Sequence, residues 1–193
     1  MYFFDIYAEE LEYKFKNLSN RNRKKLAIMS IERQFKYYSK ILENKLFNKS
    51  QEYRLILDKC WNFILFDTKL DEDIWYQQDK IHIEKFGKDY YDDDSFHLSN
   101  MLSTTCNNIM MFIEMLEDSE DDTEYTFLTL NLDYIYGYLN GIDCDKYEDI
   151  DDCENHFLTI NELNNQKNDF KVVNRINTLE DVKEWLKDCK SII

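Results

Sequence analysis

The chain has 193 residues, of which 24 are Lys or Arg and 39 are Asp or Glu, so its formal net charge is −15. That charge repels phosphate, which argues against a general nucleic-acid binder and against a binder of anionic membranes. The hydrophobic share of 44% and the aromatic share of 16% indicate a folded core, whereas three Gly and no Pro are too few for a β-sandwich or a Gly-rich nucleotide fold.

Apolar residues recur in steps of three and four along most of the chain, a pattern typical of amphipathic helices. Five stripes carry it, namely Phe4–Phe15, Ile28–Leu42, Tyr53–Ile64, Leu98–Leu116 and Leu128–Leu139. The fourth stripe keeps the pattern longest, so we expect it to form a central, well-buried helix.

Polar residues and glycines indicate where these helices begin and end. Ser19 or Asn20 should cap the second helix, and Ser50 should open the third. Gly141 should end the helix of the fifth stripe. A weaker pattern over residues 70–86 predicts one more helix between the third and fourth stripes.

The last third of the chain is less regular. Apolar residues over Phe157–Leu163 predict a helix, after which the period disappears, so residues 164–177 are expected to form an irregular connection. Thr178 should open a final helix, with Asp181 as the acid of a capping box. Together these elements predict a single all-α domain over residues 1–193, built as a bundle of about seven helices.

The sequence favours a protein of the cytoplasm. Its first ten residues lack the basic and apolar pattern of a secretory signal, and no run approaches the roughly 18 apolar residues of a membrane span. Five cysteines form an odd set without a repeated C-x-x-C spacing, which favours reduced thiols over a disulfide or zinc framework. We therefore expect cytoplasmic localisation and no membrane contact.

The negative charge is concentrated in two clusters. Residues 1–60 carry 13 basic and 8 acidic side chains, a net charge of +5, which leaves −20 for the remainder. We expect both clusters to lie near helix ends and to bind a partner with a basic face, with tyrosines as apolar anchors. The predicted partner-binding residues are Glu117, Asp118, Glu120, Asp121, Asp122, Glu124 and Tyr125 in the first cluster, and Asp143, Asp145, Tyr147, Glu148, Asp149, Asp151 and Asp152 in the second. The alternative is that such runs are solvated loops that serve only solubility.

The second cluster has a competing interpretation as a calcium loop. Asp143, Asp145 and Glu154 match positions one, three and twelve of an EF-hand. Glu148, however, stands at the position where that motif needs Gly for its sharp turn. The pattern therefore favours partner binding, and cation binding by Asp143–Glu154 stays open.

Residue patterns typical of catalysis do not occur. His82, His97 and His156 are isolated, without the spacing of a zinc site or of a di-iron helix pair. The sequence contains neither a Gly-rich phosphate loop nor a nucleophile elbow. Cys60 lies on an apolar stripe, which is typical of a small core residue. We therefore expect no enzyme activity, no metal and no cofactor.

The segment Ser30–Arg33, followed by Tyr38 and then by Glu52–Asp58 and Trp61, resembles an all-helical bacterial family of unknown function typified by YjaG. The resemblance implies an α-helical fold and brings no catalytic residue, and the family's usual Pro after the Glu-Arg pair is missing here. The charged residues of this segment are interpreted as an ion-pair network that fixes the register of the second and third helices. These residues are Glu32, Arg33, Arg54 and Asp58.

A small, acidic, all-helical chain also resembles, in type, the immunity proteins of bacterial polymorphic toxin systems. The abundance of Asn, Lys, Ile, Tyr and Asp and the scarcity of Pro, Gly and Ala are typical of a low-GC bacterial genome. The resemblance implies that the protein binds a cognate toxin domain, of which a nuclease is one example, and neutralises it by stoichiometric occlusion. The alternatives are a regulatory or scaffold bundle, monomeric or homodimeric, and an inhibitor that mimics DNA.

Overall fold

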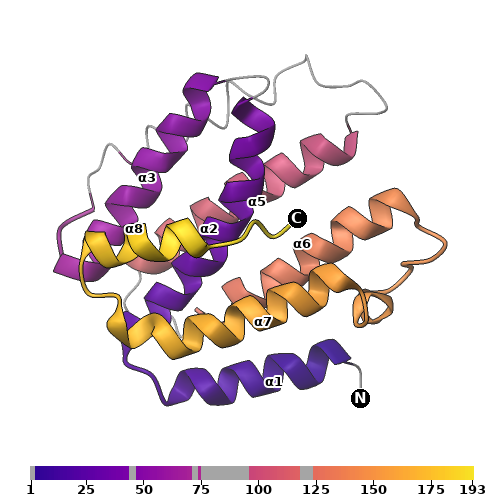
Figure 1. The fold of residues 1–193 in the computed structure, drawn as a ribbon, viewed down its shortest axis with the longest axis horizontal. Helices are drawn as coiled ribbons and strands as arrows, with labels where there is room; N and C mark the ends of the chain where they lie inside the picture. The colour runs from indigo at the N-terminus through magenta and orange to yellow at the C-terminus, as the bar shows by residue number, and fades with distance from the viewer. Residues whose placement is uncertain (1–2, 44–46, 71–73, 75–95, 118–123) are drawn as a thin grey trace.

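The computed structural model describes residues 3–43, 47–70, 74, 96–117 and 124–193 (Figure 1). This part of the chain folds into seven α-helices and contains no strand, which confirms the all-α bundle predicted from the sequence. The elements are α1 (Phe3–Lys16), α2 (Asn20–Glu43), α3 (Phe47–Phe66), α5 (Phe96–Glu117), α6 (Thr126–Ile142), η2 (Ile150–Cys153), α7 (Phe157–Val172), η3 (Val173–Arg175) and α8 (Leu179–Asp188).

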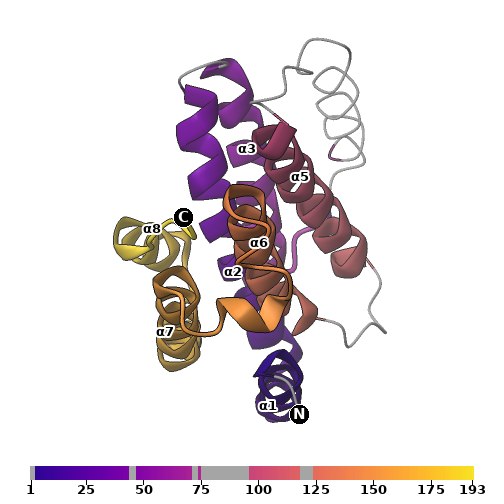
Figure 2. The same ribbon diagram turned by 90° about the vertical axis from the view of Figure 1, so that its right-hand side faces the viewer.

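Helix α2 lies at the centre of the bundle. It contacts α3, α5, α6 and α7, and α8 crosses in front of it in Figure 1. Figure 2, seen from the side, shows α6 between α5 and α7. Helix α1 runs beneath α7 in Figure 1. The two helices are in contact, since the rings of Phe15 and Phe170 are 5.7 Å apart. Beyond α8 the chain returns to α2, and the Ile192 N–H donates to the Arg33 carbonyl oxygen at 3.3 Å.

Burial on every side distinguishes α2 from the other helices. All residues of Lys25–Phe35 are buried, so no face of this segment meets solvent. Helix α5, which contains the Leu98–Leu116 stripe, keeps an exposed face that includes Met111 and Glu114. Its other face is buried against α2 and α6, with Ile109, Phe112 and Leu116 in the core, as expected for this stripe. The sequence did not reveal the greater burial of α2, because polar side chains in its middle make a fully buried segment look amphipathic.

Two of the predicted helix caps are confirmed. The Ser19 hydroxyl accepts the Asn22 N–H at 3.3 Å, at the start of α2. Thr178 and Asp181 form a capping box at the start of α8, with both reciprocal hydrogen bonds present. Each cap satisfies backbone N–H groups that a helix leaves unpaired in its first turn.

Other predicted boundaries differ. Helix α3 begins at Phe47, earlier than the predicted Ser50. Helix α6 continues past Gly141, and its capping residue is Asp143, whose N–H donates to the Leu139 carbonyl oxygen at 3.0 Å. The helix predicted over residues 70–86 lies almost entirely outside the described residues.

The irregular connection predicted over residues 164–177 is wrong. Helix α7 continues unbroken to Val172, and η3 follows directly. The buried positions of α7 include Glu162, Gln166 and Asp169, which are spaced by four and three residues and so share one helical face. The helical period is present, but polar residues carry it, since this face packs against a charged side chain of α2.

Two hydrophobic clusters stabilise the bundle. The larger joins apolar residues from α1, α2, α3, α5, α6, η3 and α8. The smaller joins the second half of α6 to the connection that follows it and to Ile192 near the chain end. Among the helices in the described part of the chain, none has the length and apolar character that crossing a membrane requires.

Candidate functional site

The structure brings three of the four predicted ion-pair residues together. Both terminal nitrogens of Arg54 on α3 donate to the Glu32 carboxylate on α2, at 2.6 and 2.7 Å. The Arg54 Nε donates to Asp58 at 2.9 Å, and the Trp61 indole N–H donates to Glu32 at 2.8 Å. A bidentate pair of this kind fixes both the distance and the orientation of two helices, so this contact can set the register of α2 and α3.

Arg33 does not join that network, and its predicted place between the second and third helices is wrong. Successive helical residues point about 100° apart, so Arg33 projects away from Glu32 and faces α7. It contacts Glu162 through Nε at 2.9 Å and through Nη2 at 2.8 Å, and its Nη1 donates to Asp169. The side chain of Arg33 is 2% exposed, so this pair lies fully inside the protein.

Gln34, the next residue, extends the polar interior toward α5 and α6. Its Nε2 donates to Asn131 on α6 at 2.6 Å, and its Oε1 accepts from Asn108 on α5 at 2.8 Å. Asn131 in turn donates to Glu162 at 2.7 Å. We call Glu32–Gln34 the α2 triplet, because three consecutive buried polar residues connect α2 with α3, α7, α6 and α5.

Further partners connect the α2 triplet with α1 and α8. Gln166 donates to Glu162 at 2.8 Å and accepts from the Tyr7 hydroxyl of α1. Asp169 accepts from the Trp185 indole of α8 at 3.1 Å. Every other α-helix in the described part of the chain therefore reaches the α2 triplet directly or through one or two side chains.

The electrostatics of Arg33 depend on this arrangement. Burial alone would lower the pKa of Arg33, but the carboxylates of Glu162 and Asp169 hold it above its ordinary value. A buried charge without partners would cost several kcal/mol of desolvation. The network therefore explains why a charged residue is tolerated in the centre of α2, and it is a structural feature of the fold.

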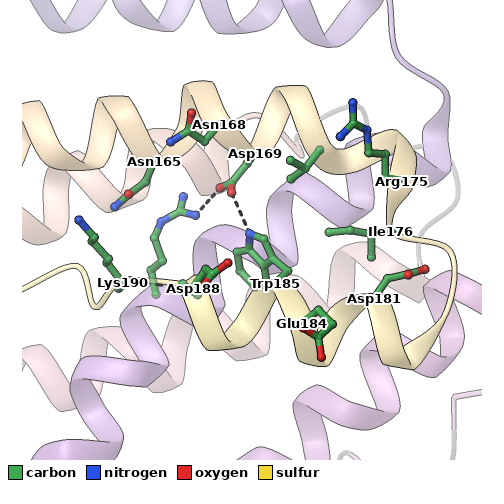
Figure 3. Close-up of a pocket in the computed structure, with 13 residues that line it drawn as sticks. Asn165, Asn168, Asp169, Arg175, Ile176, Asp181, Glu184, Trp185, Asp188 and Lys190 are labelled. Carbon is green, nitrogen blue, oxygen red and sulfur yellow. Dashed lines mark hydrogen bonds and ion pairs between the residues drawn. The ribbon is translucent and has the colours of Figure 1, made fainter.

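A cavity of about 410 Å³ lies between α7 and α8, directly over this network (Figure 3). Trp185 and Asp169 line it (Figure 3), and Arg33 of α2 lines it as well. One Asp169 oxygen accepts from Arg33 and the other from Trp185. Because these polar groups already form hydrogen bonds with one another, their first role is to hold α2, α7 and α8 together.

Cys189, which also lines this cavity, is the nearest candidate nucleophile. Burial raises the pKa of its thiol to about 12, so the thiol is protonated at neutral pH and does not have the depressed pKa of a reactive cysteine. Cys60 is buried in the core, as its position on an apolar stripe predicted, and burial raises the pKa of its thiol to about 12 as well.

The first acidic cluster is described only at its edges. Asp118, Glu120, Asp121 and Asp122 lie outside the described residues, and Glu117 is exposed at the end of α5.

Two of its predicted partner-binding residues lie wholly or partly inside the protein. Glu124 is 0% exposed and forms an ion pair with Arg23 at 3.8 Å, so its predicted role is wrong. Tyr125 is half-buried, and its ring lies 6.4 Å from that of Phe15. It therefore contributes to the core beside α1.

The second cluster forms a continuous connection between α6 and α7, which we call the acidic turn (Asp143–Glu154). Its twelve residues include seven acids and one Lys. Asp143, Asp145, Glu148, Asp149, Asp152 and Glu154 are exposed, and Asp151 is half-buried. The predicted anchor Tyr147 is buried at 6% exposure, against His156, so its predicted role as a partner-binding anchor is wrong. It fixes the turn to the smaller hydrophobic cluster instead.

Local hydrogen bonds give the acidic turn a defined shape. Asp149 and Asp152 form a capping box around η2, and Asp143 accepts the Lys146 N–H at 3.2 Å. Asp151 accepts the Phe4 N–H of α1 at 3.2 Å. These four carboxylates thus organise the turn, whereas Asp145, Glu148 and Glu154 project from it into solvent.

The calcium interpretation gains no support from this geometry. Within the described ranges, no three side chains of His, Cys, Asp or Glu come together as a metal site. In an EF-hand the loop carboxylates converge on the ion. Here Asp149 and Asp152 bind backbone N–H groups of their own turn.

No protein family, curated protein or solved structure matches the chain. The resemblances to YjaG-like proteins and to immunity proteins therefore stay predictions.

Sequence reasoning missed Gln34, Asn131, Glu162, Gln166 and Asp169, which form most of the buried network. A signal for three of them exists in the sequence, because Glu162, Gln166 and Asp169 keep helical spacing in a segment that otherwise lacks an apolar stripe. Hydrophobic periodicity cannot detect a helix whose inward face is polar.

Proposed function

We propose that this protein is an immunity-type inhibitor, which binds a protein with a basic face and neutralises it by stoichiometric occlusion. The observation that carries the proposal is the acidic turn, a shaped surface element in which seven acids and one Lys give a net charge of −6 over twelve residues. Occlusion of this kind requires no bond to be made or broken.

The shape of the acidic turn favours this function over a solvated loop. Its caps and the buried Tyr147 hold its backbone before any partner arrives, so less conformational entropy is lost on binding. Carboxylates that project from such a surface speed up the encounter with a basic partner and select against acidic ones.

The proposal can be tested by capture from a lysate of the source cells with the intact chain as bait. One variant carries Asp145→Lys, Glu148→Lys and Glu154→Lys, which removes exposed carboxylates without removing a cap. The matched control carries Glu180→Lys, Glu184→Lys and Asp188→Lys on α8, where all three residues are exposed as well. Both variants change the net charge equally.

We expect the intact chain and the α8 variant to retain one basic protein at a one-to-one ratio, and the acidic-turn variant to lose it. Retention by all three baits would exclude the acidic turn as the binding surface. Equal loss from both variants would show that only the total charge matters. Displacement by duplex DNA of a captured protein that has no nuclease activity would favour the DNA-mimic alternative over toxin neutralisation.

A further inference from the structure

A groove of about 340 Å³ lies between α1 and α7. Helix α1 lies on the side of α7 opposite to α8 (Figure 1). Its apolar lining comes from Phe3, Ile6 and Leu11 of α1 and from Leu163 and Phe170 of α7. The Tyr7 hydroxyl, which lies in the same wall, donates to Gln166. The lining is therefore largely apolar, and the Tyr7 hydroxyl within it already has a hydrogen-bond partner.

Apolar side chains of the groove lining are open to solvent. Ile6 is 43% exposed, and Phe3, Leu163 and Phe170 are half-buried. Large apolar residues that gather at one place on a surface mark an interaction site more often than scattered ones do.

The charge around the groove is uneven. Glu154 of the acidic turn lines it, and the Phe4 N–H bound to Asp151 ties the acidic turn to the start of α1. Lys14 and Lys167 also line the groove, but Lys14 pairs with Glu10 at 3.4 Å. The negative charge around the groove is therefore strongest at the end where α1 and α7 begin.

From this arrangement we infer that the groove binds an amphipathic helix of a basic partner protein. Apolar side chains one turn apart on that helix would enter the channel, and Lys or Arg residues at one end would lie over the acidic turn. A cavity of about 150 Å³ holds one benzene-sized group, so the channel has room for roughly two such anchors. This inference rests on the proposed function and adds the form of the partner's binding segment.

A second copy of this chain fits the groove less well than a basic partner does. Each copy carries a net charge of −15, so an association through this face would bring like charges together next to the acidic turn. Repulsion of this kind opposes binding, whereas a basic helix would gain both apolar contact and charge complementarity.

Fluorescence anisotropy with a synthetic probe tests this inference on the full chain. The probe is a peptide of about 14 residues, made only of Leu and Lys, with Leu on one helical face. Its length matches that of α1, which forms one wall of the groove and rises 1.5 Å per residue. A scrambled peptide of the same composition has no apolar face and reports binding by charge alone. The groove variant is Ile6→Asn with Leu163→Asn, at two positions of the lining. Its matched control is Leu55→Asn with Met111→Asn, at exposed apolar positions of α3 and α5.

We expect the intact chain to bind the amphipathic peptide about tenfold more tightly than the scrambled one, which corresponds to burial of roughly two CH₂ groups. The groove variant should lose this preference and the control variant should keep it, with unchanged helical circular dichroism in both. The acidic-turn variant should weaken the binding of both peptides.

Three results would overturn the inference. The first is equal binding of both peptides by the intact chain, and the second is loss of the preference in the control variant. The third is self-association of the intact chain, detected by light scattering, that the groove variant abolishes, because a second copy would then occupy the groove. If instead the preference persists but the acidic-turn variant binds both peptides normally, the result supports helix binding by the groove and contradicts the proposed role of the acidic turn.

Discussion

The α2 triplet and the acidic turn use the same kinds of side chain in opposite ways. Glu32, Arg33 and Gln34 are buried, and partners on neighbouring helices satisfy them. Most carboxylates of the acidic turn face solvent. Buried polar groups with partners on several helices define how those helices pack, whereas exposed ones stay available to another molecule. The role of a charged residue in this protein therefore depends on whether its side chain is buried or exposed.

The largest expected effect is that of Arg33→Met. Removing the guanidinium leaves Glu162 and Asp169 buried without their cation, which typically costs about 3–5 kcal/mol in the free energy of unfolding. Chemical denaturation followed by circular dichroism measures this loss. A triple variant that adds Glu162→Gln and Asp169→Asn should recover part of it, because no uncompensated charge remains. A loss below about 1 kcal/mol for the single variant would contradict a stabilising role of the network.

Arg54→Met should cost less, about 1–3 kcal/mol. The side chain of Arg54 is 29% exposed, and Glu32 keeps the hydrogen bond from Trp61 when Arg54 is removed. A double-mutant cycle with Glu32→Gln isolates the pair, and we expect a coupling energy of about 1 kcal/mol or more. Zero coupling would remove this pair as the contact that fixes the register of α2 and α3.

His156 should make the stability of the protein depend on pH. It lies where the acidic turn meets α7. Its Nδ1 accepts the Leu158 N–H at 3.3 Å, which requires the neutral form, and burial together with Lys146 lowers its pKa below 6.5. The folded protein thus binds this proton less readily than the unfolded chain does. The stabilisation is complete above pH 6.5 and is lost as the pH falls through the lowered pKa.

The variant His156→Asn should remove this pH dependence, since Asn caps helices without titrating. Thermal unfolding of both proteins between pH 7 and pH 5 measures the difference. Parallel curves for the intact chain and the variant would show that His156 does not titrate with folding.

The smallest effect on stability is expected for the acidic-turn variant with Asp145→Lys, Glu148→Lys and Glu154→Lys. None of these three side chains caps a helix, and surface substitutions of this kind usually change stability by about 0.5 kcal/mol or less each. The denaturation midpoint should therefore stay close to that of the intact chain. A large loss of stability would mean that these carboxylates serve the fold and not a partner.

The sequence predicted the helical class, most helices and two caps because apolar periodicity and short-range capping are local properties. It did not predict that α2 is the most deeply buried helix or that α7 continues to Val172, since the inward faces of both helices carry polar residues. Which cation meets which carboxylate depends on helix packing, so the sequence paired Arg33 with the wrong helix. Burial of Glu124 and Tyr147 likewise follows from tertiary contacts that spacing does not encode.

The most direct test of the central claim is the rate of association between this protein and the basic protein that it captures, measured over a series of salt concentrations. We expect the acidic-turn variant to associate more slowly than the intact chain and with a weaker dependence on salt, while the α8 variant resembles the intact chain. Identical rates and identical salt dependence for all three proteins would contradict a partner-binding role of the acidic turn.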